Sequence, residues 1–192
     1  KVHMSALTAS VILALNKIEP IFQLTVRDRN RLALQGDLVG ASALGVHNIL
    51  CLSGDNPKNG DQPETLVVND IDSLTLISTA NMMRGEKMFP SGRKIDPSPK
   101  LFIGGAEIPT HGVPNPDRIL KKIENGVNFF QTQYVFEPKI LKEYMKVLED
   151  SGVLEKAFFI IGLGPFASAK SAKWMNDNLY GVDVPEEIIK RL

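Results

Sequence analysis

Apolar and polar positions along this chain follow two alternating periodicities. Short unbroken apolar runs are typical of strands buried on both faces of a parallel sheet. Between them, apolar residues recur three or four positions apart, which is the spacing of amphipathic helices. The pattern predicts strands near 21–26, 49–52, 101–103, 127–135 and 157–161, and helices near 4–15, 28–44, 70–85, 115–125, 137–148, 168–176 and 185–192. Strands that alternate with helices in this way predict an α/β fold made of βαβ units.

Capping residues mark several of the expected helix ends. Asp28 is expected to cap the second helix, and Gly45 follows the end of that helix. Asp70 or Asp72 would begin the third helix, after a polar loop over 53–69. The segment that follows this helix, 86–100, is rich in Pro and Lys and is expected to be an exposed excursion.

The order of elements leaves two ways of closing a parallel sheet, an open doubly wound sheet or a (β/α)₈ barrel. The Gly-rich phosphate fingerprints of the open type are missing from the sequence. Barrels carry their chemistry on several strand ends instead, and polar residues follow several of the strands expected here. We therefore expect a TIM barrel as one partial domain over 1–192, with about five of the usual eight strands in this chain.

Composition narrows the classes of partner. Lys plus Arg and Asp plus Glu both number 22, so no basic surplus favours nucleic acid. No apolar run is long enough for a membrane span and no signal peptide is visible, which makes a cytoplasmic protein the expectation. Cys51 is the only cysteine and lies within an apolar strand, so it is expected to be a buried hydrophobe. The three histidines, His3, His47 and His111, lack ligand spacing, and no metal site is expected.

The strand over 49–52 runs directly into Ser53, Gly54 and Asp55. A glycine at this place permits a sharp turn or a close approach to a ligand. Asp55 would present a carboxylate just past the carboxyl end of the strand, where parallel α/β folds build their sites. The alternative is a structural turn in which Asp55 caps the next helix.

Amide side chains occur where the inside of a barrel is normally apolar. Because strand residues alternate between faces, Gln23 shares a face with Thr25, and Gln131 shares one with Gln133. Buried amides cost free energy unless they are hydrogen-bonded, so these four residues suggest a polar ligand such as a flavin or a pterin. An amide network satisfied within the protein is the alternative.

Two groups of charged residues are open to more than one interpretation. Lys121 and Lys122 follow the strand that ends in Gly104 and Gly105, and a solvated lysine face is the simpler interpretation. A phosphate contact at the rim of a site is the functional one. The residues Arg27, Asp28, Arg29 and Arg31 are expected to serve in helix capping and surface pairing.

Several motifs, in order along the whole chain, resemble the methylenetetrahydrofolate reductase family, and most closely its bacterial, acetogen-type members. They are the run 22–31 with 33–35 after it, the Gly-Asp-x-Pro-like loop at 52–57, the Gln-Thr-Gln strand end at 131–133, the segment 162–165 and the segment 184–192.

The resemblance implies a (β/α)₈ barrel that binds a flavin, FAD or FMN, at its C-terminal mouth. It implies hydride transfer from NADH or NADPH to the flavin and then to 5,10-methylenetetrahydrofolate, by ping-pong kinetics, giving 5-methyltetrahydrofolate for one-carbon metabolism. It also makes an oligomer, or a subunit of a larger complex, the expected assembly.

The resemblance assigns roles residue by residue. Asp55 would be the catalytic carboxylate, close to the flavin and to the pterin of the folate, where it would stabilise a cationic five-iminium folate. Gln133 would hydrogen-bond the folate, and Gln23 would lie beside the flavin where other members have His. The remaining cofactor contacts would be Thr25, Ser53, Gly54 and Ala106 around the flavin and Lys121 and Lys122 at its phosphate.

Two departures from the family pattern bear on these roles. The general acid of the family is a Glu on its first strand, and on this alignment the first strand and the last strand fall outside the chain. The strand end at Gly104, Gly105, Ala106 and Glu107 also differs from relatives that carry an aromatic residue followed by Pro. A non-redox, pterin- or folate-binding barrel therefore stays as the alternative function.

Overall fold

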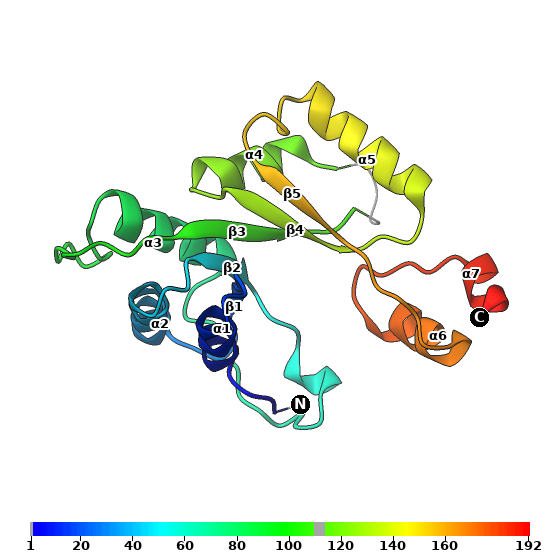
Figure 1. The fold of residues 1–192 in the computed structure, drawn as a ribbon, viewed down its shortest axis with the longest axis horizontal. Coiled ribbons are helices and arrows are strands. Elements are labelled where there is room, and N and C mark those ends of the chain that lie inside the picture. Colours follow the sequence, from blue (N-terminus) through cyan, green and yellow to red (C-terminus); the bar gives the residue numbers. More distant parts are fainter. Residues whose placement is uncertain (1, 110–113) are drawn as a thin grey trace. The chain divides into compact units, whose positions relative to one another are not determined.

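The computed structural model describes residues 2–109 and 114–192, so His111 lies outside the described residues. The chain divides into two compact units. We call Lys1–Gly105 with Glu124–Asn128 the N-terminal unit, and Ala106–Ile123 with Phe129–Leu192 the C-terminal unit. Helices alternate with strands through both (Figure 1). Whether the two units form one barrel domain stays a prediction.

The N-terminal unit contains three parallel strands, with β1 paired to β2 and β2 paired to β3. Helix α1 packs against β1, and α3 packs against both α2 and β2. The elements are α1 (Ala6–Leu15), β1 (Ile21–Thr25), α2 (Arg31–Ala43), β2 (Asn48–Leu52), the short 3₁₀-helix η1 (Pro57–Asn59), α3 (Ser73–Gly85) and β3 (Phe102–Glu107), whose last two residues belong to the C-terminal unit.

The two faces of this sheet differ in burial. One face carries apolar side chains from all three strands that are 0–2% exposed: Phe22, Leu24, Ile49, Cys51 and Ile103. On the other face, Gln23 is exposed and Thr25 is half-buried. Parallel register aligns Gln23 with Leu50, and Leu50 with Gly104. The polar positions expected from the sequence therefore lie on the less buried face.

The C-terminal unit contains the parallel pair β4–β5 and four helices among its described residues. Phe130 of β4 stacks on Phe159 of β5 with ring centroids 5.1 Å apart. Ala172, Val182 and Val184 form a small separate core. Partly buried side chains pack against it from the last two helices and from the chain before them, among them Phe166 and Ile188. The elements are α4 (Pro116–Glu124), β4 (Phe129–Tyr134), α5 (Pro138–Asp150), β5 (Phe158–Gly162), α6 (Ala169–Asn178) and α7 (Glu186–Arg191).

Most helix ends lie where the capping residues predict them. Asp72 caps α3 through the Thr75 amide, at 2.7 Å. Gly45 has a φ of 80°, as expected of a glycine just past a helix. The expected cap at Asp28 is wrong, because the Asn30 side chain accepts the amides of Leu32 and Ala33, in the first turn of α2, at 3.1 and 3.0 Å. Asp28 instead pairs with Arg27.

The α/β class with parallel strands is confirmed. Cys51 is confirmed as a buried hydrophobe, and burial raises the pKa of its thiol to about 12. The mixed-charge cluster is confirmed as surface pairing, since Arg29 pairs with Asp37 at 2.9 Å and Arg31 with Asp70 at 2.8 Å. No helix among the described residues is long and apolar enough to cross a membrane.

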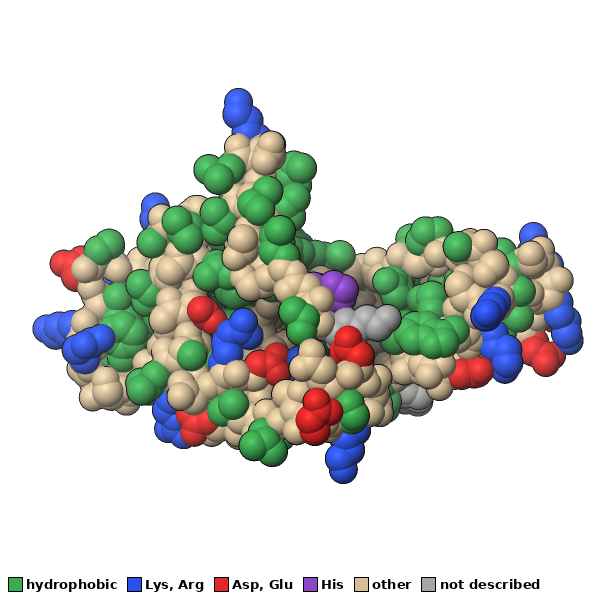
Figure 2. Space-filling model, turned by 90° about the horizontal axis from the view of Figure 1, so that it is seen from below, with side chains coloured by type: hydrophobic (Ala, Val, Ile, Leu, Met, Phe, Trp, Pro, Cys, Tyr) green, Lys and Arg blue, Asp and Glu red, His purple; other side chains and the backbone are tan. Residues whose placement is uncertain are grey.

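The surface drawn in Figure 2 carries both signs of charge side by side among hydrophobic side chains. This mixture agrees with the equal numbers of acidic and basic residues in the sequence. Within 2–109 and 114–192, no group of three or more His, Cys, Asp or Glu is placed to hold a metal ion.

Candidate functional site at the strand ends

The carboxyl end of β2 turns sharply into an exposed loop over 53–69. Gly54 makes the turn with a φ of 86°, and a Cβ there would lie 3.0 Å from the Arg27 Cβ and 3.3 Å from the Thr25 Cβ. Both the positive φ and the close approach therefore require a glycine. Ser53, just before it, donates its hydroxyl to the Ser73 hydroxyl at 3.2 Å.

Asp55 stands just past this turn, as the sequence predicts, and its side chain is exposed. Its backbone carbonyl accepts a hydrogen bond from Arg27 Nη1 at 2.9 Å. No hydrogen bond or ion pair of its carboxylate is found among the described residues. The carboxylate is therefore available to a ligand, and the alternative of a helix cap is not what the structure shows.

A hollow of about 440 Å³ lies beside Asp55 in the N-terminal unit. Its walls come from the start and the end of the loop over 53–69, which folds back on itself. They combine one carboxylate, one lysine, three uncharged polar side chains and four apolar ones: Gly54, Asp55, Asn56, Pro57, Lys58, Pro63, Thr65, Leu66, Val67 and Asn69. Small-molecule sites combine apolar walls with polar groups that orient the ligand, and this hollow offers both kinds of side chain.

The less buried face of the same unit brings further predicted residues to this strand end. Thr25 lies in register with Leu52, the last residue of β2. The Thr25 hydroxyl donates to Asp28 at 3.4 Å, a long contact. Gln23 lies two residues earlier on the same face, with its amide exposed. The N-terminal unit therefore holds five of the predicted site residues: Gln23, Thr25, Ser53, Gly54 and Asp55.

Gln133, in β4, has an amide that is already bonded to backbone. Its Nε2 donates to the Tyr180 carbonyl at 2.9 Å, and its Oε1 accepts from the Tyr134 amide at 3.0 Å. For this residue the structure favours the alternative interpretation, an amide satisfied within the protein. A contact with folate stays a prediction, and it would use the remaining hydrogen-bonding capacity of the amide.

Lys122 and Arg118 share one face of α4, four residues apart, and both bind Glu107 at the end of β3. Arg118 Nη2 lies 2.5 Å from Glu107 Oε2, and Lys122 Nζ lies 2.6 Å from Oε1. Lys122 also donates to the Ala106 carbonyl at 2.8 Å. The Glu107 side chain is only 1% exposed. Its charge is therefore compensated by two cations, as a buried carboxylate requires.

Sequence reasoning missed Glu107, although a signal for it exists. Its position in the strand pattern makes it a buried residue, and a buried carboxylate needs a cationic partner. The spacing of Arg118 and Lys122 could have supplied that partner.

The Tyr144 hydroxyl, also buried, has no hydrogen-bond partner among the described residues. Burial, and then the charge of Glu107, raise the pKa of Tyr144.

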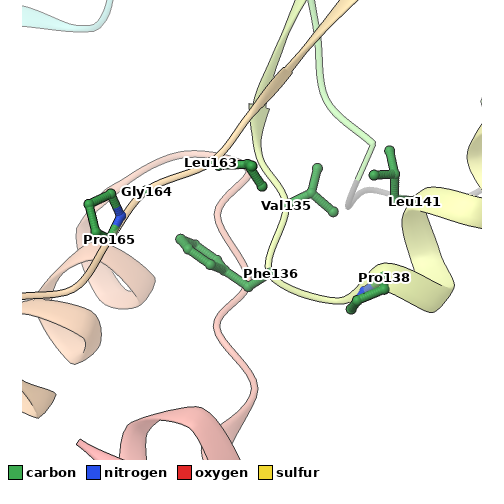
Figure 3. Close-up of a pocket in the computed structure, with 7 residues that line it drawn as sticks. All are labelled: Val135, Phe136, Pro138, Leu141, Leu163, Gly164 and Pro165. Carbon is green, nitrogen blue, oxygen red and sulfur yellow. The ribbon is translucent and has the colours of Figure 1, made fainter.

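A second hollow, of about 490 Å³, lies past the ends of β4 and β5 in the C-terminal unit. Figure 3 shows the ring of Phe136 directed toward Gly164 and Pro165. The walls carry no charged side chain: Val135, Phe136, Pro138, Leu141, Leu163, Gly164 and Pro165. The lack of converging polar groups makes this hollow the weaker candidate.

The predicted site residues are thus divided between the two units. Ala106, Lys121, Lys122 and Gln133 belong to the C-terminal unit, and the other five to the N-terminal unit. Lys121 is exposed on α4. The expectation that all nine residues converge on one ligand stays a prediction, and the strongest local site is the strand end at Asp55.

Comparisons with known proteins point to one family. The family model described as Methylenetetrahydrofolate reductase matches residues 1–192. Methylenetetrahydrofolate reductase 2 of Schizosaccharomyces pombe is 26% identical over 185 residues, which cover 92% of this chain and 28% of that protein. This chain therefore spans little more than a quarter of the length of that curated relative.

A solved structure is also similar to this chain at a TM-score of 0.42 and 18% identity, with coverage of 97% of this chain and 79% of the other. It is described as an uncharacterized protein from Clostridium thermocellum that binds two copies of 5-methyl-5,6,7,8-tetrahydrofolic acid.

Proposed function

This chain belongs to the methylenetetrahydrofolate reductase family, whose fold is the TIM barrel, and on that basis we propose that the protein reduces 5,10-methylenetetrahydrofolate to 5-methyltetrahydrofolate. NADH or NADPH would be the reductant, and a bound flavin, FAD or FMN, would carry the hydride between the two substrates. The main support from the structure is the exposed Asp55 carboxylate at the end of β2, beside a hollow of about 440 Å³.

The residues on the less buried face of the N-terminal unit fit the ring of a flavin. Gln23 offers an exposed amide, and Gly104 has no side chain beside Leu50 in the register of β2 and β3. Uncharged donors and acceptors suit the carbonyl and N–H groups of such a ring. In this proposal Gln23 and Thr25 orient the ring, and Ser53 and Gly54 line its pocket.

Asp55 would act on the folate. A carboxylate that is exposed and makes no hydrogen bond within the described residues can approach the cationic form of the folate without breaking a hydrogen bond. Opposite charge at the reacting carbon stabilises the species that accepts the hydride. Gln133 is proposed as a further folate contact, on the resemblance described above.

The flavin content of the protein tests this proposal. The purified protein should show the visible absorption of a bound flavin, or gain it when FAD or FMN is added, and NADH or NADPH should bleach it. Addition of methylenetetrahydrofolate without oxygen should then restore the absorption. A colourless protein that takes up neither flavin would overturn the proposal.

One observation favours a second candidate, a folate-binding barrel that works without a flavin. Lys122, expected at the phosphate of the cofactor, already binds Glu107 and the Ala106 carbonyl. A flavin phosphate would have to share this ammonium with a buried carboxylate. Titration calorimetry of a tetrahydrofolate into flavin-free protein separates the candidates, because tight binding with no flavin uptake supports the second one alone.

A further inference from the structure

Arg27 makes contacts at both ends of the loop that carries Asp55. Its Nη1 donates to the Asp55 carbonyl at 2.9 Å, near the start of the loop. Its own backbone carbonyl accepts the Val68 amide at 2.8 Å, near the end of the loop. The segment between these two contacts is exposed except at Pro57, so few packing contacts of its own can hold it in place.

The Arg27 guanidinium is itself held in one orientation. Asp28 binds it in a bidentate fashion, with Nε to Oδ1 at 2.6 Å and Nη2 to Oδ2 at 2.8 Å. This pairing lowers the pKa of Asp28 and raises the pKa of Arg27, so both charges persist across the neutral range. A planar guanidinium fixed on one edge presents its other N–H in a defined direction. That direction is toward the Asp55 carbonyl.

The packing of Gly54 supports the same geometry. The Arg27 Cβ and the Thr25 Cβ lie against the position where a Gly54 Cβ would be, at 3.0 and 3.3 Å. The turn therefore sits directly on β1 and on Arg27, with no room for adjustment on that side. The Arg27 side chain is only 29% exposed, which limits how far the guanidinium can rotate into water.

From these contacts we propose that Arg27 is a positioning residue that fixes the Asp55 carboxylate at the strand end by bracing the loop over 53–69 at both ends. The inference deepens the proposed function and rests on it, because it gives Arg27 a role in the folate step through Asp55. Arg27 acts through the backbone of Asp55 and Val68, and no contact with the reacting atoms is assigned to it.

Hydrogen exchange and proteolysis of the purified protein test the brace without any assay of activity. In Arg27→Ala, amide exchange in peptides covering 53–69 should become faster, and trypsin should cleave after Lys58 more readily, because the loop loses the side-chain hydrogen bond at its Asp55 end, while the backbone bond between Arg27 and Val68 remains. In Arg27→Lys, the rates of amide exchange and of tryptic cleavage should lie between those of Arg27→Ala and of the unmodified protein, since a lysine can reach one carbonyl but cannot form the bidentate pair.

A matched control is available two residues away. Arg29 also pairs with a carboxylate, Asp37, at 2.9 Å, and its side chain is exposed to a similar degree, 31%. Its carboxylate partner belongs to α2 and not to the loop over 53–69. Arg29→Ala removes an ion pair of the same kind, so exchange and cleavage in the loop should stay as in the unmodified protein.

Kinetics then separate positioning from general damage. In Arg27→Ala, folate reduction should slow by about tenfold or more, since small misplacement of a catalytic group is costly. Oxidation of NADH or NADPH by an artificial acceptor should stay within about twofold, because that half-reaction is not assigned to Asp55. Arg27→Lys should restore part of the lost rate.

The outcomes distinguish the two claims. If the unmodified protein cannot reduce folate, the proposed function is overturned, and the catalytic part of the inference with it, even where loop exchange is faster in Arg27→Ala. An active reductase in which Arg27→Ala leaves loop exchange and folate reduction unchanged would overturn the inference and leave the proposed function standing. Equal losses in both half-reactions would also overturn it.

Discussion

Two carboxylates at the ends of consecutive strands have opposite surroundings in this chain. Asp55 follows β2 and is exposed, with no hydrogen bond to its carboxylate among the described residues. Glu107 ends β3 with 1% of its side chain exposed and binds both Arg118 and Lys122. Each lies where parallel folds place catalytic groups. Position at a strand end is therefore not enough, and a carboxylate must also be free of structural partners.

Replacing Asp55 should produce the largest effect. Asp55→Asn removes the charge that we propose stabilises the folate cation, and should lower the rate of folate reduction by roughly 100-fold. Its melting temperature should hardly change, because the carboxylate makes no hydrogen bond within the described residues. Steady-state kinetics and thermal unfolding measure the two effects. Glu64→Gln, an exposed carboxyl in the same loop, is the control and should keep its activity.

Replacing Glu107 should do the reverse, and affect stability more than chemistry. Glu107→Gln leaves two cations without their carboxylate, and should lower the free energy of unfolding by about 2 kcal/mol. Urea unfolding measures this change. Glu149→Gln removes a carboxyl that pairs with Lys146 at 3.6 Å on an exposed helix face, and should cost less than about 0.5 kcal/mol. Equal costs for the two variants would contradict the distinction drawn between buried and exposed carboxylates.

The turn before Asp55 offers a smaller perturbation. Gly54→Ala should cost about 1–2 kcal/mol, because alanine is strained at positive φ and its Cβ would press on Arg27. Gly45 has a φ of 80° and no atom within 4 Å of an added Cβ, so Gly45→Ala introduces backbone strain without a steric clash. It should lower the free energy of unfolding by about 1 kcal/mol. Unfolding curves compare them, and only Gly54→Ala should also raise the folate KM. A raised KM in both would show that the effect is not local.

The smallest effect concerns Asp70, which lies just past the end of the same loop. Asp70 pairs with Arg31 at 2.8 Å, and this bond lowers the pKa of Asp70 to about 2. Because the folded pKa is lower than the unfolded one, of about 4, the pair stabilises the fold above pH ~4 and loses that contribution as the pH falls toward ~2. Asp70→Asn should therefore flatten the acid end of the stability profile slightly. An unchanged profile between these pH values would contradict the pairing.

Local sequence signals predict the elements well, because they depend on neighbours in the chain. The apolar run over 49–52 and the cap at Asp72 needed no knowledge of the rest of the fold. The choice between Asp28 and Asn30 as a cap depends on a side-chain pairing between adjacent residues, which the capping signal does not report. Both residues can cap a helix, and the bidentate pairing of Asp28 with Arg27 settles which one does.

The candidate site could be predicted only in part, because some of its contacts are distant in the sequence. Asp55 and Gly54 are recognisable within one strand and one turn. The partners of Gln133 and Glu107 are not, because Tyr180 lies 47 positions from Gln133 and the cations of Glu107 lie on a later helix. Whether a polar side chain is already hydrogen-bonded within the protein depends on such distant contacts. The alternation of side chains along a strand shows only on which face of the sheet each residue lies.

Rapid mixing under anaerobic conditions can follow each half-reaction separately, in Asp55→Asn and in the unmodified protein, and gives the sharpest test of the role assigned to Asp55. If the Asp55 carboxylate serves the folate step, reoxidation of the reduced protein by methylenetetrahydrofolate slows by roughly 100-fold in the variant. Reduction by NADH or NADPH keeps its rate within about twofold. Folate-driven reoxidation at the unmodified rate, or an equal loss in both half-reactions, would refute that role.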